Sequence, residues 1–220
     1  MPKKPFTPEE IAAQRERIMD SASHVMAEVG FHHLSMRKLA SQLGMTASNI
    51  YNYFPNKESL FVFTRRRGFE MAFQDINEQM SQHLDPRSAL YNFAGHLIQF
   101  ALRSPGYYQL MFQPPRMTLT DPEVVDRDVL LQVDRLAEEW QSHLLSMLAD
   151  AVPAISAASE ARQKQLALFF VSSLHGLIDT YYYKALPKLL SGVDLIPDDV
   201  VETHIGWLLA SLEHQAESIH

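Results

Sequence analysis

The hydrophobic residues of this chain recur every three or four positions over most of its length, which is the spacing of one face of an α-helix. Four helix starts carry the same signal, a capping side chain followed by a proline that fits the first helical turn. They are Thr7-Pro8, Asp85-Pro86, Ser104-Pro105 and Asp121-Pro122. Longer periodic stretches predict helices over residues 124–149, 159–186 and 197–218, with short linkers over 113–120, 150–157 and 187–196. The pattern predicts an all-α protein of about nine helices and no strand.

Residues 35–60 carry the most detailed pattern, which predicts two short helices joined by a tight turn. Gly44 can turn the chain after the first helix, and Thr46 can cap the second. Ile50 and Phe54 lie four positions apart, so both are expected to pack inward against the first helix. The small and polar residues of the second helix then face outward. This arrangement is typical of a helix-turn-helix, whose second helix enters the major groove of DNA.

A third helix is expected to follow directly. Pro55 ends the second helix, and Asn56 can cap a helix that begins at Lys57. The positive end of that helix and the Lys57 ammonium would both attract a phosphate of the DNA backbone. Further basic residues of this helix are expected to meet solvent or other parts of the protein rather than DNA: Arg65, Arg66 and Arg67. The competing interpretation of the whole stretch is a solvated pair of surface helices with ordinary turns.

The same stretch resembles the TetR family of bacterial transcription regulators over about residues 9 to 61. The resemblance is carried, in the family's order, by Gly30, Leu39-Ala40, Gly44, Tyr51, Phe54 and Lys57. It implies that bases or adjoining phosphates are faced by Thr46, Ala47, Ser48 and Asn49. It also implies that the DNA backbone is held by Ser35, Arg37, Tyr51, Tyr53 and Lys57. Ala47 has no polar group and could read only a thymine methyl group.

The charge of the chain is divided unevenly. Residues 1–70 carry ten Lys or Arg against seven Asp or Glu, a balance of +3, whereas residues 71–220 carry nine against nineteen, a balance of −10. A basic DNA-binding part joined to an acidic body places the attraction to phosphate in one part of the protein. We therefore expect a three-helix DNA-binding domain over residues 1–60 and a larger helical domain for effector binding and dimerisation over residues 61–220.

Several classes of function find no support in the sequence. The chain has no cysteine, which excludes thiol redox sensing, disulfides and cysteine metal sites. It has no phosphate-binding loop, nucleophile elbow or metal-binding motif, so we expect no enzyme activity, no cofactor and no metal site. No apolar run is long enough to span a bilayer, and the N-terminus lacks the apolar centre of a signal peptide. These features predict a cytoplasmic protein without a membrane partner.

The second domain carries less specific signals. Residues 104–113 and 174–183 resemble one C-terminal subtype of the TetR family, in which a His-Gly pair lies in the penultimate helix. Aromatic and Met side chains with a few polar groups are typical of a pocket for a small, largely apolar effector. The candidates are Tyr107, Met111, Phe112, Trp140, His143, Met147, Phe170, His175 and Asp179. Each of them could also be an ordinary core residue.

His175 and Asp179 are one helical turn apart, where they could form a metal or catalytic pair. Because no third ligand accompanies them, a core histidine oriented by a hydrogen bond to the carboxylate is the favoured interpretation. Gly176 lies inside the same helix and predicts the close approach of another helix or of a ligand, of which helix packing is favoured.

A homodimer is expected, because one recognition helix covers only a few base pairs whereas two related by a twofold axis read a palindrome. The last two helices carry apolar stripes that could form a four-helix bundle with a second copy. The predicted interface residues are Leu166, Phe169, Leu177, Tyr181, Ile205, Leu208, Leu209 and Leu212. The sequence thus favours a homodimeric repressor released from a double-stranded operator by an unidentified effector. The alternatives are a DNA-binding structural protein without ligand control and an enzyme in the helical body.

Overall fold

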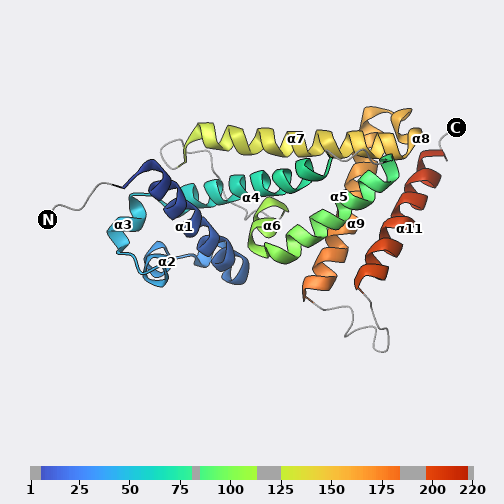
Figure 1. Ribbon diagram of the computed structural model, residues 1–220. Coiled ribbons are helices and arrows are strands. Elements are labelled where there is room, and N and C mark those ends of the chain that lie inside the picture. The colour runs from blue at the N-terminus through green and yellow to red at the C-terminus, as the bar shows by residue number, and fades with distance from the viewer. Residues whose placement is uncertain (1–5, 81–84, 113–124, 184–196, 218–220) are drawn as a thin grey trace. The chain divides into compact units, whose positions relative to one another are not determined.

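The computed structural model describes residues 6–80, 85–112, 125–183 and 197–217 of the 220-residue chain. In these residues all regular structure is helical, which confirms the predicted fold class: ten α-helices and one short 3-10 turn (Figure 1). None of the described helices is both long and apolar enough to cross a membrane.

Contacts between residues divide the chain into two compact units, which are described separately here. The first contains residues 1–71 and 104–137, and the second contains residues 72–103 and 138–220. Helices α4 (Lys57–Met80) and α7 (Arg127–Ala151) contribute residues to both units. The division at residue 60 that the sequence suggests is a functional one and stays a prediction.

The first unit contains the N-terminal elements together with one helix from the middle of the chain. Besides the first parts of α4 and α7, these are α1 (Pro8–Val29), the 3-10 turn η1 (Phe31–His33), α2 (Met36–Gln42), α3 (Ala47–Tyr51) and α6 (Pro105–Phe112). The predicted cap of α1 is present. The Thr7 hydroxyl accepts a hydrogen bond from the Glu10 N–H at 3.3 Å, and the Glu10 carboxylate accepts one from the Thr7 N–H at 2.8 Å. The helix ends at Gly30, whose φ of 82° suits glycine.

The second unit is built from the second parts of α4 and α7 and from α5 (Pro86–Arg103), α8 (Pro153–Ser156), α9 (Glu160–Tyr183) and α11 (Pro197–Glu217). Helix α5 packs against α9 and α11, and α8 packs on the same two helices (Figure 1). Completely buried apolar side chains of α5, α7, α8, α9 and α11 fill the space between them, for example Leu90, Leu148, Ile155, Phe170 and Leu212. The core of this unit is therefore made within the single chain.

The sequence pattern was wrong about the segment 150–157, which was expected to be a linker. Pro153 starts the short helix α8 there, and Ile155 anchors it with 0% of its surface exposed. A helix of one turn is too short to show a periodic apolar pattern. This helix accounts for the difference between the nine helices expected and the ten found in the described residues.

The helix starts at Pro86 and Pro105 are confirmed. Helix α7 instead begins at Arg127, slightly later than the residue 124 expected. Its capping group is Asp126, whose carboxylate accepts a hydrogen bond from the Asp128 N–H at 2.9 Å. Some predicted features lie outside the described residues. They are the helix start at Asp121-Pro122, the linkers over 113–120 and 187–196, and the end at residue 186 of the helix that begins near 159.

Candidate nucleic-acid interface

The turn between α2 and α3 follows from a few local contacts. The Ser35 hydroxyl accepts a hydrogen bond from the Lys38 N–H at 3.4 Å and so caps α2. The Thr46 hydroxyl accepts one from the Asn49 N–H at 3.2 Å and so caps α3. Between the two helices Gly44 adopts a φ of 68°, which other residues rarely do. The sequence therefore fixes both helix starts and the turn that joins them.

Helix α3 ends at Tyr51, with Asn52 as its C-terminal cap, and so stops before Pro55, the residue expected to end it. Ile50 within the helix and Phe54 just after it hold this segment on the core, both with 0% of their surface exposed. Helix α3 packs on α2, where Leu39 is also buried. This packing confirms the inward face that the spacing of the two residues predicts. It leaves the opposite face of the short helix α3 free of core contacts.

The predicted DNA contacts lie on accessible parts of the helix-turn-helix. The exposed ones are Arg37, Thr46, Ser48 and Tyr51, and the half-buried ones are Ser35, Ala47, Asn49, Tyr53 and Lys57. The hydroxyl oxygens of Ser35 and Thr46 each accept a capping hydrogen bond, but each hydroxyl can still donate its hydrogen to a phosphate oxygen. Their contacts with DNA remain predictions.

Lys57 opens α4 beside the predicted cap. The Asn56 side-chain oxygen Oδ1 accepts a hydrogen bond from the Ser59 N–H at 2.6 Å, which confirms Asn56 as the capping residue. The Lys57 ammonium lies 4.7 Å from the centroid of the buried Phe31 ring. This cation–π contact fixes the positive charge near the start of the helix, where the helix dipole also favours an anion.

Three polar side chains of α1 reach the helix-turn-helix, and the sequence pattern had not singled them out. Gln14 donates a hydrogen bond to the Met45 sulfur at 3.1 Å. Arg15 donates to the Tyr53 carbonyl at 2.6 Å, and Arg17 donates to the Leu43 carbonyl at 3.2 Å. A polar residue on an amphipathic helix has the sequence pattern of a solvated face. No local signal distinguishes it from a side chain that binds a neighbouring element.

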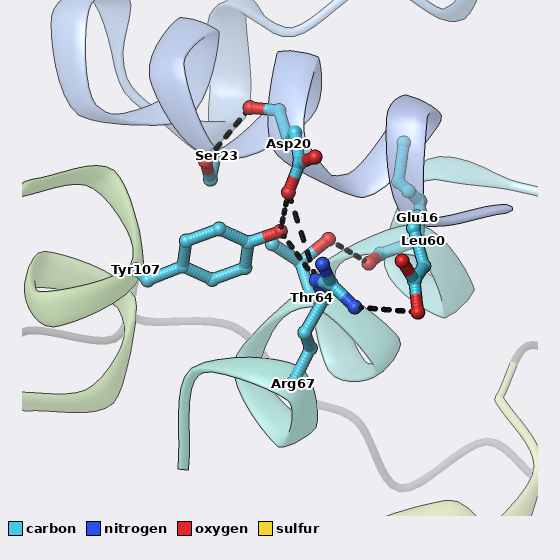
Figure 2. A network of polar contacts seen from close by, with 7 residues as sticks. All are labelled: Glu16, Asp20, Ser23, Leu60, Thr64, Arg67 and Tyr107. Atoms are coloured by element: carbon cyan, nitrogen blue, oxygen red, sulfur yellow. Dashed lines mark hydrogen bonds and ion pairs between the residues drawn. The ribbon is translucent and has the colours of Figure 1, made fainter. Parts of the chain in front are cut away.

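A second polar network joins α1, α4 and α6 within the first unit (Figure 2). Arg67 of α4 pairs with Glu16 of α1 at 2.9 Å and donates to the Tyr107 hydroxyl of α6 at 3.1 Å. That hydroxyl donates to Asp20 of α1 at 2.6 Å. Burial, and then the bond to Asp20, raise the pKa of Tyr107 above its usual value. Arg67 therefore meets other parts of the protein, as the sequence analysis expected.

Gly106 allows α6 to lie directly on the backbone of α1. A Cβ atom at this position would be 2.4 Å from the Ser23 carbonyl oxygen and 2.6 Å from the Ser23 carbonyl carbon. Any larger residue would therefore have to push the two helices apart.

Comparison with known proteins decides the family. The protein-family model described as "Bacterial regulatory proteins, tetR family" matches residues 18–62. The model of "Tetracyclin repressor-like, C-terminal domain" matches residues 90–204, just over half of the chain. The chain belongs to the TetR family. The first match contains the whole helix-turn-helix described above, and the second contains most of α5 to α9.

The curated relatives of this TetR-family protein have different names. The fatty acid metabolism regulator protein of Bacillus subtilis is 37% identical over 67 residues, which are 29% of this chain and 34% of that protein. Nucleoid occlusion factor SlmA of Vibrio vulnificus is 22% identical over 175 residues, which are 76% of this chain and 83% of that protein. The chain spans between about a third and three-fifths of the length of this Bacillus subtilis regulator and of two other curated relatives.

Among solved structures, AibR in complex with isovaleryl coenzyme A and operator DNA has a similar fold. Its TM-score is 0.68 at 16% identity, with 89% of this chain and 98% of that chain covered. At 16% identity, this similarity shows a shared fold and nothing more.

The effector candidates of this TetR-family protein fall into both units. In the first unit, the Tyr107 hydroxyl is already bonded to Asp20, and Met111 is buried next to Gly68 of α4. The ring of Phe112 lies tilted against that of Tyr108, with 4.8 Å between the ring centroids. In the second unit, Trp140 lies 6.0 Å from the ring of Phe93 and His143 lies 5.8 Å from the ring of Phe73. The remaining apolar candidates of this unit, Met147 and Phe170, are buried.

His175 and Asp179 do not form the core pair that was favoured. Their nearest nitrogen and oxygen are 3.8 Å apart, too far for a hydrogen bond, and the side chains are 24% and 43% exposed. Within the described residues, no group of three or more His, Asp or Glu side chains could hold a metal ion. The close approach expected at Gly176 is also missing inside the described chain, because an added Cβ would meet nothing within 4 Å.

The predicted dimer-interface residues lie mostly inside the chain's own core. Those that are buried there are Leu166, Leu177, Ile205, Leu208, Leu209 and Leu212, whereas Phe169 is 43% exposed. The side chain of Tyr181 lies outside the described residues. An apolar stripe first packs on the nearest helices of the same chain. Among the described side chains of α9 and α11, the large apolar ones that stay exposed are Leu168, Phe169 and Trp207. The interface itself stays a prediction.

Proposed function

We propose that this protein is a sequence-specific DNA-binding transcriptional regulator that acts as a homodimeric repressor. Its operator is palindromic, and a small, largely apolar effector releases it. The observation that carries the proposal is the arrangement of α3. Ile50 and Phe54 hold its inner face in the core, and its outer face and capped start are accessible.

The start of α3 supplies the base contacts in this proposal. An Asn side chain can form two hydrogen bonds with adenine, so Asn49 is the residue that would select a base. Ala47 can contact only a thymine methyl group. Ser35, Arg37, Tyr51, Tyr53 and Lys57 would hold phosphates and set the register of the helix in the groove.

Two copies of α3 must be held about 34 to 36 Å apart to read a palindrome. The exposed Trp207 and Leu168, at 72% and 67% exposure, support an interface on α11 and α9. Leu208 is a poor position for testing it, because its side chain is only 6% exposed within the single chain. A charge placed there would unfold the protein rather than separate two copies.

The second unit offers the better support for an effector site. Trp140, His143 and Met147 follow one face of α7, and Phe73 and Phe93 lie against the first two of them. The Nδ1 atom of His143 is buried and has no hydrogen-bond partner among the described residues, so a ligand oxygen or N–H could bind it. An apolar surface with one such polar group suits an apolar ligand with few polar atoms.

Effector and DNA are coupled through the conformation of the dimer. An effector that binds better to a dimer whose recognition helices are wrongly spaced lowers DNA affinity by the same free energy. Helix α4 begins next to the helix-turn-helix and continues into the second unit, so we propose it as the element that transmits the change.

A thermal-shift panel followed by operator release tests the sensor. The panel contains fatty acids, acyl-coenzyme A thioesters, sugars and free phosphates. Acyl thioesters are included because AibR was crystallised with isovaleryl coenzyme A. Fatty acids or acyl thioesters should raise the Tm and release DNA, and His143→Ala should lose this response while the exposed His24→Ala keeps it. If only the sugars or free phosphates stabilise the protein, or if His143→Ala responds fully, the proposed pocket is wrong.

A second candidate function is a DNA-binding structural protein without ligand control. The similarity to nucleoid occlusion factor SlmA, which extends over 76% of this chain, is the observation that favours it. Footprinting across the genome separates the two. A regulator should occupy one or a few promoters, whereas a structural protein should occupy many dispersed sites.

A further inference from the structure

Arg15 of α1 lies in an unusual environment for a charged side chain. Its guanidinium carbon is 4.4 Å from the centroid of the Phe54 ring and 4.5 Å from that of the Phe63 ring. The two rings meet edge to face, with 5.7 Å between their centroids, and Phe54 is completely buried. Arg15 therefore contacts both the residue that anchors α3 and a residue of α4.

The same guanidinium also binds the chain where α3 ends. Its Nη1 donates to the Tyr53 carbonyl at 2.6 Å, directly after the C-terminal cap Asn52. Carbonyl groups at the end of a helix have no partner inside the helix, and this end also favours a positive charge. Arg15 thus binds the first carbonyl after the C-terminal cap of the candidate recognition helix.

Ion pairing does not explain this placement, since Arg15 forms no salt bridge with any of the residues that the structure describes. Burial, and then the nearby Arg66, lower the pKa of Arg15, so the surroundings work against its charge. What the site uses is the planar, branched guanidinium. A guanidinium can stack on aromatic rings with its faces and donate hydrogen bonds in its plane at the same time, which a lysine ammonium cannot do.

We propose that Arg15 is a positioning residue for α3: by binding the Tyr53 carbonyl and stacking on Phe54 and Phe63, it fixes the angle of the recognition helix without touching DNA. This inference rests on the proposed function, because it assumes that α3 reads bases. The competing possibility is that Arg15 itself holds a DNA phosphate.

Three variants of the full-length protein separate these possibilities. Arg15→Met removes both the charge and the planar guanidinium group. Arg15→Lys keeps the charge but removes the planar group. Arg17→Met is the matched control, because Arg17 lies on the same helix and donates one hydrogen bond to the Leu43 carbonyl. Hydrogen exchange of residues 46–56 is measured on free protein. Affinity for the operator and for random DNA is measured over a range of salt concentrations.

Both Arg15 variants should exchange faster over residues 46–56, by about tenfold, because neither Met nor Lys can bind the Tyr53 carbonyl while stacking on Phe54 and Phe63. The ratio of operator to random-DNA affinity should also fall about tenfold, or about 1.4 kcal/mol. The salt slope should not change, because no phosphate contact is lost. Arg17→Met should leave the exchange and the affinity ratio within about twofold of the wild type.

Several results would overturn the inference. A salt slope that falls by about one unit per subunit with unchanged exchange would make Arg15 a phosphate contact. Full recovery in Arg15→Lys would show that only charge matters, and normal behaviour of both variants would remove any role. If Arg15→Met does not fold, Arg15→Lys carries the test. If the wild type prefers no DNA sequence, the proposed function fails, while the exchange data still decide whether Arg15 orders α3.

Discussion

The contact between α6 and α1 predicts that alanine at Gly106 lowers the free energy of unfolding. Alanine at Gly95, outside any close contact, should raise it. In Gly106→Ala, the new Cβ would lie 2.4 Å from the Ser23 carbonyl oxygen, where ordinary contacts begin at 3.4 Å. The helices must therefore separate by about 1 Å, because the clashing atoms belong to the backbone and cannot rotate away. Overpacking of this kind costs about 1 to 3 kcal/mol, and Ala regains at most about 1 kcal/mol of helix propensity. We expect a net loss of about 1 to 2 kcal/mol in the free energy of unfolding.

Thermal and urea unfolding of the two alanine variants test this estimate. For a chain of this size the loss corresponds to a fall in Tm of about 2 to 8 °C. Gly95→Ala is the control, because a Cβ there would meet nothing within 4 Å. It should gain up to about 1 kcal/mol from helix propensity alone. An unchanged or raised Tm for Gly106→Ala would refute the close packing of α6 on α1.

Three further predictions concern other parts of the protein. The pKa of Tyr107 is raised in the folded state, so its stabilising effect is fully present below its usual value of 10.0 and is lost as the pH rises above it. Urea denaturation from pH 9 to pH 11 should therefore show a smaller loss of stability in Tyr107→Phe than in the wild type, and equal losses would contradict the raised pKa. Lys57→Ala should weaken binding to all DNA sequences about equally and lower the salt slope by roughly one unit per subunit, whereas an unchanged slope would remove Lys57 from the interface. Trp207→Glu should sediment as a folded monomer, while Leu131→Glu, on an exposed position of α7, stays dimeric. A dimeric Trp207→Glu would place the interface elsewhere.

The local features of the fold were the ones that the sequence could predict. The caps at Thr7, Thr46 and Asn56 and the turn at Gly44 depend on residues at most three positions away, and all four are present. Helix α8 was missed because one turn is too short to show a period.

Contacts between distant residues could not be predicted in the same way. The apolar period of α11 shows that Leu208 lies on a packed face, but not whether that face meets the same chain or a second copy. Tyr107 has the composition of a pocket residue, yet its hydroxyl is bound by Asp20, which is far away in the sequence. Arg15 likewise becomes informative only when Phe54 and Phe63 are seen on either side of one guanidinium.

Selection of bound duplexes from a random-sequence library, by the wild type and by Asn49→Ala, tests the central claim that the outer face of α3 reads DNA. The wild type should enrich a palindrome whose half-sites are centred about 10 to 10.5 base pairs, or a multiple of that, apart. Asn49→Ala should enrich the same palindrome with one position in each half-site relaxed, by about 1 to 3 kcal/mol. No enrichment by the wild type, or an identical motif from the two proteins, would contradict the account.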